Sequence, residues 1–203
     1  MENALRVSHV SKDYPGFSLK DISFELPKGS VMGLIGQNGA GKTTTLKSIL
    51  GLISSEGEIE ILGSVSGKET LAKKEEIGVV FDEMNFYETL TPEETGKIFH
   101  KIYKNWDRKQ YQEYLKKFRL PEKKEIKTFS KGMQVKLSLA VALSHHAKLL
   151  ILDEATSGLD PVMRDEILDI FLDFVQDEEH SILVSSHITS DSVSYTHLRA
   201  HET

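Results

Sequence analysis

Residues 36–43 read GQNGAGKT, a glycine-rich stretch that ends in Lys42 and Thr43. Polyphosphate oxygens are bound by several backbone N–H groups that converge on one point, where side chains would obstruct the approach. Glycine supplies that bare backbone together with permissive dihedral angles. A lysine here can reach the β and γ phosphates, and the following hydroxyl can ligate magnesium. The predicted nucleotide contacts are Gly36, Gln37, Asn38, Gly39, Ala40, Gly41, Lys42, Thr43 and Thr44.

The elements on either side of this loop support the interpretation. Residues 31–35 form an apolar run typical of a buried strand, and residues 43–50 carry apolar side chains at helical spacing. The free N–H groups and the positive dipole end of such a helix add to an anion site. The alternative is a glycine-rich turn that caps an ordinary helix. The strand before the turn and the helix after it favour phosphate binding.

A second pair of chemically useful residues is Asp153 and Glu154, which follow the apolar run 149–152. Such a run is typical of a central parallel strand, and open α/β sheets bind ligands at the carboxyl ends of their strands. One carboxylate can hold magnesium through water while the next accepts a proton from an attacking water. Adjacent acids after a strand are otherwise an ordinary solvated turn. The upstream phosphate loop favours the catalytic interpretation.

The remaining pattern predicts the scaffold that positions these residues. Strand, helix and strand follow one another over residues 149–184, which predicts a parallel sheet. Thr91 and Pro92 are typical of a helix start, and a helical lobe is predicted between two parts of an α/β core. Further strands are predicted at 5–10, 22–26, 57–62, 77–81 and 182–184, and helical segments at 68–74, 91–118, 130–144 and 161–174.

Composition limits the class of protein. The chain has 203 residues, 39% of them hydrophobic and 28% charged, as expected for a soluble globular domain. The net charge of -6 argues against a nucleic-acid partner, which we do not expect. The chain has no cysteine, and the absence of an amino-terminal apolar segment favours a cytosolic location. No apolar run approaches membrane-spanning length, so we expect any membrane role to come through a partner.

The motifs GQNGAGKT, FSKGM, LLILDE, SGLD and SSH occur in this order between about Val7 and Asp191. In order and spacing the chain resembles the ATP-binding subunits of ABC transporters. The resemblance implies an α/β P-loop NTPase fold with a parallel core sheet, an N-terminal antiparallel β subdomain and an inserted α-helical subdomain. It implies a domain over residues 1–191, with the helical subdomain at about 82–146. It also implies ATP and magnesium as cofactors.

The same resemblance implies roles for particular residues. Two subunits would sandwich two nucleotides, with Ser130 and Gly132 of one touching the γ-phosphate bound by the other. Asp160 would belong to the loop that links the two sites. The expected catalytic residues are Glu154 as the base, with His187 and Lys42 stabilising charge. The expected magnesium ligands are Thr43, Asp153 and Asp82.

Two of these assignments have specific alternatives. Tyr14 matches the aromatic residue on which adenine stacks, with Phe17 as the competitor and core packing as the alternative. Asp82 stands where the family usually has glutamine or sometimes glutamate, and an aspartate has a shorter reach. A histidine such as His187, taken alone, is more often a loop residue with satisfied hydrogen bonds, but its place after a buried strand that ends in Ser185 and Ser186 matches the family closely.

The chain departs from the family pattern in two further places. The signature reads FSKGM where leucine-serine-glycine-glycine-glutamine is commoner, which keeps the serine and the second glycine. This variant resembles bacterial, mostly Gram-positive, exporter ATPases linked to peptide or antibiotic efflux. Residues 192–203 read SVSYTHLRAHET, which resembles a translated sequencing-adapter tail. We expect residues from about Ser192 to be non-native and the domain to be truncated at its carboxyl end.

The resemblance implies an ATPase that powers export of a substrate, with peptides or antibiotics as the expected cargo, through a separate transmembrane permease subunit. The working unit would be a homodimer or a heterodimer of ATP-binding subunits at the cytoplasmic face of the cell membrane. Two other classes remain as alternatives: a soluble ABC-type ATPase that acts on ribosomes or nucleic acid, and a non-catalytic nucleotide switch. A single domain, an acidic balance and no heptad run argue against the first. The intact Lys42, Asp153, Glu154 and His187 argue against the second.

Overall fold

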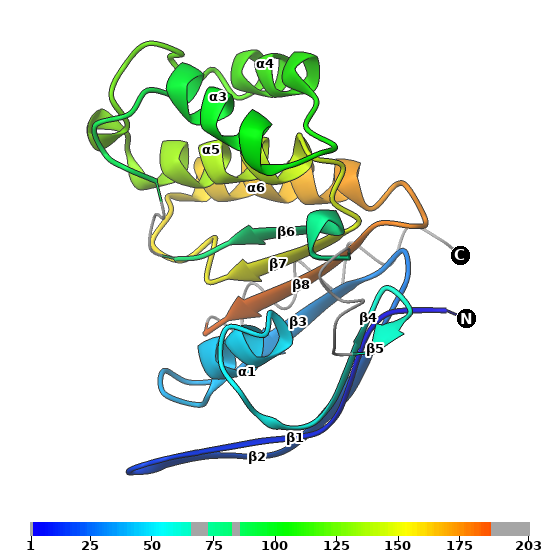
Figure 1. The fold of residues 1–203 in the computed structure, drawn as a ribbon. Helices are drawn as coiled ribbons and strands as arrows, with labels where there is room; N and C mark the ends of the chain where they lie inside the picture. The colour runs from blue at the N-terminus through cyan, green and yellow to red at the C-terminus, as the bar shows by residue number, and fades with distance from the viewer. Residues whose placement is uncertain (1, 66–72, 83–85, 188–203) are drawn as a thin grey trace.

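The structure is a computed structural model that describes residues 2–65, 73–82 and 86–187. Its amino-terminal part is an antiparallel sheet in the order β2-β1-β4-β5. This sheet lies at the bottom of Figure 1. Its strands are β1 (Asn3–Tyr14), β2 (Phe17–Pro27), β4 (Glu56–Ile61) and β5 (Ser64–Val65).

The second sheet is parallel and has the order β3-β8-β7-β6. Its strands are β3 (Val31–Ile35), β6 (Ile77–Val80), β7 (Leu149–Asp153) and β8 (Ser181–Ser186). Every residue of β7 and β8 is buried, as their near-continuous apolar sequences predict for central parallel strands. The parallel core sheet and the antiparallel amino-terminal sheet are both confirmed.

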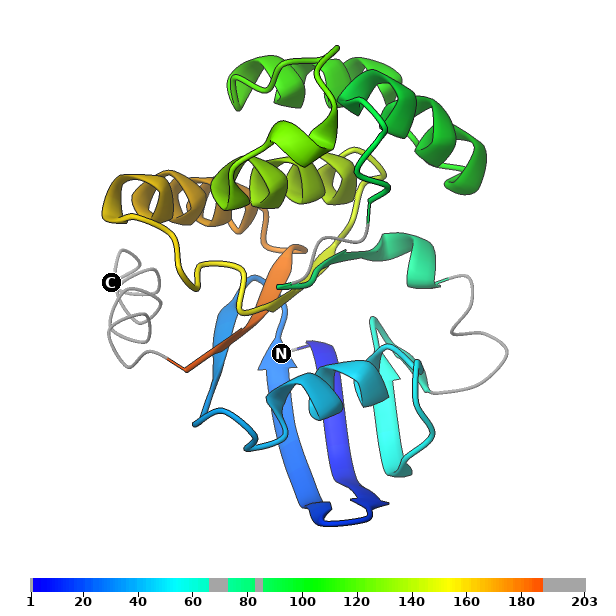
Figure 2. The ribbon, with the colours of Figure 1, turned by 90° about the vertical axis from the view of Figure 1, so that its left-hand side faces the viewer.

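Helices cover both faces of the parallel sheet. The helix α1 (Lys42–Ile49) lies between the two sheets, and α5 (Lys131–Leu143) and α6 (Pro161–Phe174) cover the other face (Figures 1 and 2). Successive side chains of β7 point to opposite faces: Leu150 and Leu152 join the helical core, whereas Leu149 and Ile151 join the core against α1. One strand therefore links the two hydrophobic cores.

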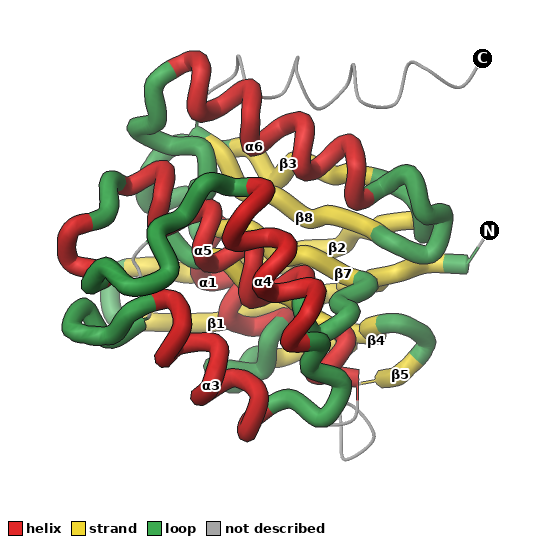
Figure 3. Tube along the Cα trace, turned by 90° about the horizontal axis from the view of Figure 1, so that it is seen from above, coloured by secondary structure: helices red, strands yellow, loops and turns green. Residues whose placement is uncertain are grey.

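The predicted helical run 91–118 is two helices, α3 (Pro92–Ile102) and α4 (Arg108–Lys117). Thr91 caps α3 in a capping box with Glu94, as the sequence indicated. The run breaks because Asp107 starts a new helix by accepting a hydrogen bond from Gln110 N at 2.9 Å. In the view from above, α4 lies over α5, and α3 lies on the side of α4 away from α6 (Figure 3).

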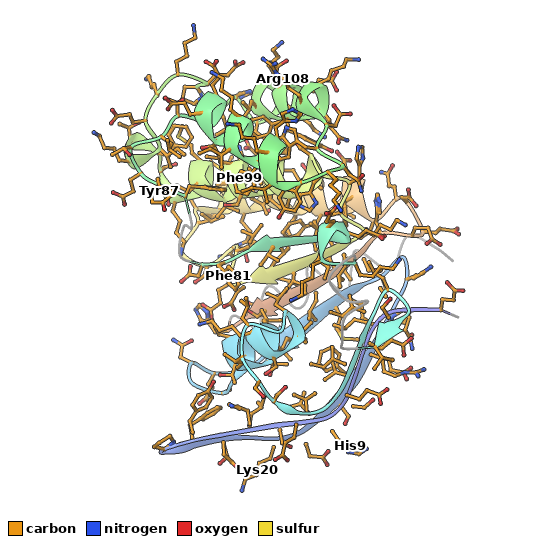
Figure 4. The ribbon with its side chains drawn as sticks, viewed as in Figure 1. His9, Lys20, Phe81, Tyr87, Phe99 and Arg108 are labelled. Atoms are coloured by element: carbon orange, nitrogen blue, oxygen red, sulfur yellow. The ribbon has the colours of Figure 1, made fainter. Side chains whose placement is uncertain are left out.

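Aromatic rings fill the space below α3 and α4. Phe99, labelled in Figure 4, has its ring centroid 5.8 Å from that of Phe86, 5.9 Å from Tyr103 and 6.1 Å from Trp106. Trp106 continues to Tyr111 at 5.0 Å. This cluster joins the core formed by α5 and the sheet. It holds the helical layer above the strands through apolar contact.

The first hairpin is longer than predicted. β1 and β2 continue to the pair Tyr14 and Phe17, around a turn at Pro15 and Gly16 in which Gly16 has φ of 87°. Proline followed by a glycine with positive φ suits a tight turn. The polar stretch 11–14 lacks apolar alternation, so its strand character comes from pairing across the hairpin.

Part of the sequence interpretation lies outside the described residues. This holds for residues 68–72 of the predicted helical segment 68–74 and for residues 192–203. The last residue of that helical segment, Lys74, begins a 3-10 turn, η1 (Lys74–Glu76). A second 3-10 turn, η2 (Ile126–Thr128), precedes α5. Within the described ranges, every helix is too short or too polar to cross a membrane.

Candidate functional site

The glycine-rich loop connects β3 to α1 at the carboxyl edge of the parallel sheet, on the left in Figure 1. Gly39 and Gly41 have φ of 81° and 96°, a region that favours glycine. A Cβ on Gly41 would lie 2.8 Å from Leu19 Cδ1 and 2.9 Å from Phe17 Cζ. Bare backbone at Gly41 is therefore required both by its dihedral angle and by the β2 side chains beside it.

Lys42 is the first residue of α1 and is 8% exposed. Its Nζ donates to the carbonyl oxygens of Gly36 at 2.7 Å and Gln37 at 3.2 Å. The same ammonium lies 3.4 Å from Glu154 Oε1. A buried cation needs such partners, because an unpaired charge out of water is costly. The loop thus folds around its own lysine and places the ammonium beside the Glu154 carboxylate.

A hydrogen-bonded chain joins α1 to the ends of β7 and β8. Thr43 Oγ1 donates to Asp153 Oδ2 at 2.8 Å, and Ser185 Oγ donates to Asp153 Oδ1 at 2.6 Å. Ser185 Oγ also accepts a hydrogen bond from Glu154 N at 3.0 Å. Sequence reasoning had not included Ser185 among the site residues; a serine at the end of the strand beside the Asp–Glu pair was the available signal.

Glu154 and His187 face each other at the same edge. His187 Nδ1 lies 3.0 Å from Glu154 Oε2, so this carboxylate bridges Lys42 and His187. Glu154 has φ of 50°, which is uncommon for a residue with a side chain. Residues held in such conformations cluster at functional sites. We call Lys42, Thr43, Asp153, Glu154 and His187 the phosphate-loop cluster.

The second group of predicted residues lies around the start of α5. Ser130 caps α5 by accepting a hydrogen bond from Met133 N at 3.3 Å, and Asp160 caps α6 by accepting one from Met163 N at 3.0 Å. A Cβ on Gly132 would lie only 2.5 Å from Met163 Cγ, so this glycine lets the two helix starts approach. We call Ser130, Lys131, Gly132 and Asp160 the signature cluster.

One turn further along, α5 and α6 are joined by an ion pair between Lys136 and Glu166. The hydrogen bond from Lys136 lowers the pKa of the Glu166 carboxyl below its usual range. The start of α5 is therefore tied to α6 by packing at Gly132 and by charge at Lys136.

The Asp82 side chain pairs with Lys131 of the signature cluster. Its Oδ1 is 2.5 Å from Lys131 Nζ. In the described part of the chain, no hydrogen bond or ion pair joins its side chain to Thr43 or Asp153. Likewise, no side-chain hydrogen bond there links Ser130 to the phosphate-loop cluster. The structure thus assembles the predicted site residues into two groups.

The two aromatic candidates lie on either side of the hairpin turn. Tyr14 is 40% exposed, with Lys12 Nζ 5.5 Å from its ring centroid. Phe17 is partly buried and lies against Gly41 in the phosphate loop. Phe17 is thus the aromatic ring beside the phosphate loop, and Tyr14 is the more exposed of the two. Both remain candidates for stacking on a base.

The phosphate-loop cluster fits a magnesium nucleotide. The buried ammonium of Lys42 and the start of α1 suit phosphate oxygens. Thr43 and Asp153 present a hydroxyl and a carboxylate 2.8 Å apart, which are the oxygen donors that magnesium prefers. Residues 2–65, 73–82 and 86–187 contain no group of three or more His, Cys, Asp or Glu side chains placed to hold a metal. Magnesium in nucleotide sites commonly uses only one or two protein ligands, with phosphate and water completing its shell.

The chain is similar in sequence to a family of known proteins. The profile of a family described as "ABC transporter" matches residues 19–157. The chain is 41% identical over 172 residues to the linearmycin resistance ATP-binding protein LnrL of Bacillus subtilis (strain 168), covering 81% of this chain and 55% of that one. It is 35% identical over 191 residues to the lantibiotic transport ATP-binding protein SrtF of Streptococcus pyogenes, covering 92% and 81%.

A solved structure described as the ATP binding subunit of an ABC transporter has the same arrangement, with a TM-score of 0.80 and 30% identity. That match covers 95% of this chain and 82% of the other. By contrast, the chain spans between 55% and 64% of the length of three of its curated relatives.

Proposed function

The chain belongs to the ABC transporter family, and from that premise we propose that it binds ATP with magnesium and hydrolyses it to power transport. The observation that carries this proposal is the phosphate-loop cluster. There Glu154 forms an ion pair with Lys42, with Oε1 and Nζ 3.4 Å apart, and its Oε2 lies 3.0 Å from His187 Nδ1. The hydrogen-bonded Thr43–Asp153 pair lies at the same edge of the sheet. A base, a phosphate-binding cation and a pair of metal-binding oxygens at one sheet edge suit phosphoryl transfer to water.

The reaction follows from the position of each group. Lys42 and the amides of the glycine-rich loop bind the phosphates and so place the γ-phosphorus at the carboxyl end of the sheet. Glu154 polarises a water for in-line attack and accepts its proton. His187 holds the Glu154 carboxylate and stabilises charge that develops on the γ-phosphate. Thr43 and Asp153 would hold magnesium, which would neutralise charge on the phosphate oxygens.

We propose that the signature cluster completes the site of a second subunit. Ser130 is exposed, and in the described residues no side-chain hydrogen bond joins it to the chain's own phosphate-loop cluster. Ser130 and Gly132 at the start of α5 would contact the γ-phosphate bound by the other subunit, where the helix dipole favours anions. Asp160 would then lie between the two sites.

We further propose export of a peptide or antibiotic as the transport reaction. The names of two relatives support this: one is a linearmycin resistance protein and the other a lantibiotic transport protein. The membrane path would be supplied by a separate transmembrane subunit, with this chain bound at the cytoplasmic face of the membrane.

Phosphate release by the purified full chain tests the catalytic proposal. The wild type should release phosphate from ATP in a magnesium-dependent reaction, and Glu154→Gln should lower turnover by about 10²- to 10⁴-fold while ATP still binds. Glu179→Gln, which changes an exposed carboxylate outside the cluster, is the matched control and should keep full turnover. Unchanged turnover in Glu154→Gln would remove that residue from the role of base.

Co-purification tests the transport proposal. The chain, expressed together with a multi-span membrane protein from a neighbouring gene, should be recovered with it from detergent extracts, and the pair should show higher ATPase activity than the chain alone. A chain that is recovered with ribosomes instead would support the soluble alternative.

A further inference from the structure

The two motif positions at which this sequence departs most clearly from the common family pattern are in contact. Asp82 stands where glutamine is usual, and Lys131 where the first glycine of the signature is usual. They are 49 residues apart in sequence, yet Lys131 Nζ lies 2.5 Å from Asp82 Oδ1. The two departures therefore form a single ion pair.

This ion pair joins the parallel sheet to the start of α5. Asp82 follows β6 directly after Phe81, which Figure 4 labels at the end of that strand. Lys131 is the first residue of α5 and follows the cap residue Ser130. Further along α5 the contact with β6 is apolar, since a Cβ on Gly78 would lie 2.8 Å from Ala142 Cβ. Charge thus holds the first turn of α5 to the sheet, and packing holds its last turns.

A third segment meets the same ammonium. A Cβ on Gly158 would lie 3.9 Å from Lys131 Nζ. Gly158 belongs to the turn between Glu154 and α6, and has φ of 70°. The Lys131 ammonium therefore lies where the end of β6, the start of α5 and the turn after Glu154 converge.

The ion pair is weak enough to orient the start of α5 without holding it rigidly. The side chains of Lys131 and Asp82 are 40% and 47% exposed. Ion pairs that are this exposed contribute little to folding stability and are screened by salt. Such a pair biases the orientation of the helix start while the bias stays reversible.

We propose that Asp82 and Lys131 are a positioning pair, which orients the Ser130 end of α5 relative to the Asp153–Glu154 edge of the sheet. This inference rests on the proposed function for its consequence: the pair sets how readily the composite nucleotide site assembles. Neither residue acts on the phosphates directly. Each acts through Ser130, whose orientation at the start of α5 the ion pair biases.

The test compares Asp82→Ala and Lys131→Ala with the charge-exchanged variant, in which Asp82→Lys and Lys131→Asp are combined. Amide hydrogen exchange of residues 129–137 is followed in the full chain without nucleotide. Each single variant should exchange about two- to fivefold faster than the wild type, and the exchanged pair should recover most of the protection. Lys117→Ala, which removes a similarly exposed inter-helix pair with Asp173, is the control and should leave residues 129–137 unchanged.

Steady-state kinetics then separate positioning from structural support. The KM for ATP should rise about two- to fivefold in the single variants, because assembly of the site is less favourable, while kcat stays within about twofold. The exchanged pair should restore KM, and high salt should make the wild type resemble the single variants.

Two results would overturn the inference: an exchanged pair no closer to the wild type than the single variants, or equal changes in Lys117→Ala. If the exchange results hold and the wild type releases no phosphate, the positioning pair stands and the proposed function fails. If the wild type hydrolyses ATP and the hydrogen exchange of the variants does not differ, the positioning pair alone fails.

Discussion

The phosphate-loop cluster and the signature cluster are built from similar residue types at the same edge of the sheet, yet they differ in where their partners lie. Lys42 and Asp153 are 8% and 5% exposed, and each is paired within the chain. Ser130 and Lys131 are exposed at the start of a helix, with a backbone amide and a surface carboxylate as their partners. The first cluster is complete within one chain, and the second presents its groups outward.

This difference teaches which properties each cluster should govern. Buried charges that are paired with each other depend on every member, because removal of one leaves another without a partner out of water. Exposed groups at a helix start tolerate substitution, because water replaces a lost partner. Changes at the buried Lys42 and Asp153 should therefore affect folding and nucleotide binding together, whereas changes in the signature cluster should affect mainly the assembly of a composite site.

The largest effect is expected at Gly41. Gly41→Ala forces a side chain into φ of 96° and against Leu19 and Phe17, so the free energy of unfolding should fall by about 2–4 kcal/mol. Urea unfolding followed by circular dichroism measures this. Gly39→Ala has a similar φ with no atom within 4 Å of the added Cβ, and should cost clearly less. Equal losses in the two variants would show that contact with β2 is unimportant.

Lys42→Ala should show the next largest effect, on nucleotide affinity. Loss of the buried ammonium removes charge-assisted hydrogen bonds to phosphate, so the Kd for ATP should rise about 10- to 100-fold. Isothermal titration calorimetry measures this, with Lys47→Ala, an exposed lysine in the last turn of the same helix, as the control. An unchanged Kd in Lys42→Ala would contradict the assignment of the loop as a phosphate site.

A smaller effect is expected of low pH on the free energy of unfolding, through a buried histidine beside α5, the helix that begins at the signature cluster. His145 follows α5, stacks on Tyr103 at 3.9 Å and pairs through Nδ1 with the Glu75 carbonyl oxygen. Burial lowers the pKa of His145, so the unfolded chain binds a proton more readily as the pH falls below about 6.5. The free energy of unfolding should therefore decrease with falling pH, by at most about 1.4 kcal/mol per pH unit from this group.

Urea unfolding of wild type and His145→Asn at pH 7.5 and 5.5 checks this expectation, since asparagine can keep the hydrogen bond to the Glu75 carbonyl without the titration. The advantage of the wild type should shrink as the pH falls. His100→Asn, on an exposed face of α3, is the control and should leave the pH dependence as it is. Parallel losses of stability in wild type and His145→Asn would argue that His145 does not contribute.

The smallest effect is expected at Ser130. Ser130→Ala removes the hydroxyl that caps α5 at Met133 N, so the free energy of unfolding should fall by only about 1 kcal/mol. ATP binding to the isolated chain should stay the same, whereas ATP-dependent association of two chains should weaken. Sedimentation with and without ATP measures the difference. A loss of ATP binding in the isolated chain would contradict the division into two clusters.

Sequence reasoning located elements well where local signals mark both ends. The helix predicted at 161–174 is α6 (Pro161–Phe174), because Asp160 caps it and Pro161 suits its first position. It was less accurate where partners decide the structure. β1 continues to Tyr14 because β2 pairs with it, and the helical run 91–118 divides at Asp107 because a cap there competes with continuation. Strand pairing joins distant residues and leaves little trace in hydrophobic periodicity, and a polar cap such as Asp107 lies outside that periodicity although it is local.

For the candidate site, the sequence by itself determined the residue types and the edge of the sheet at which they gather. A glycine-rich loop between strand and helix, and an Asp–Glu pair after a buried strand, carry their chemistry in local spacing. Only the tertiary structure decided which groups pair. It paired Ser185 with Asp153, Glu154 with both Lys42 and His187, and Asp82 with Lys131. The physical reason is that ion pairs and hydrogen bonds act over a few ångströms in space, between residues whose separation along the chain gives no indication of that distance.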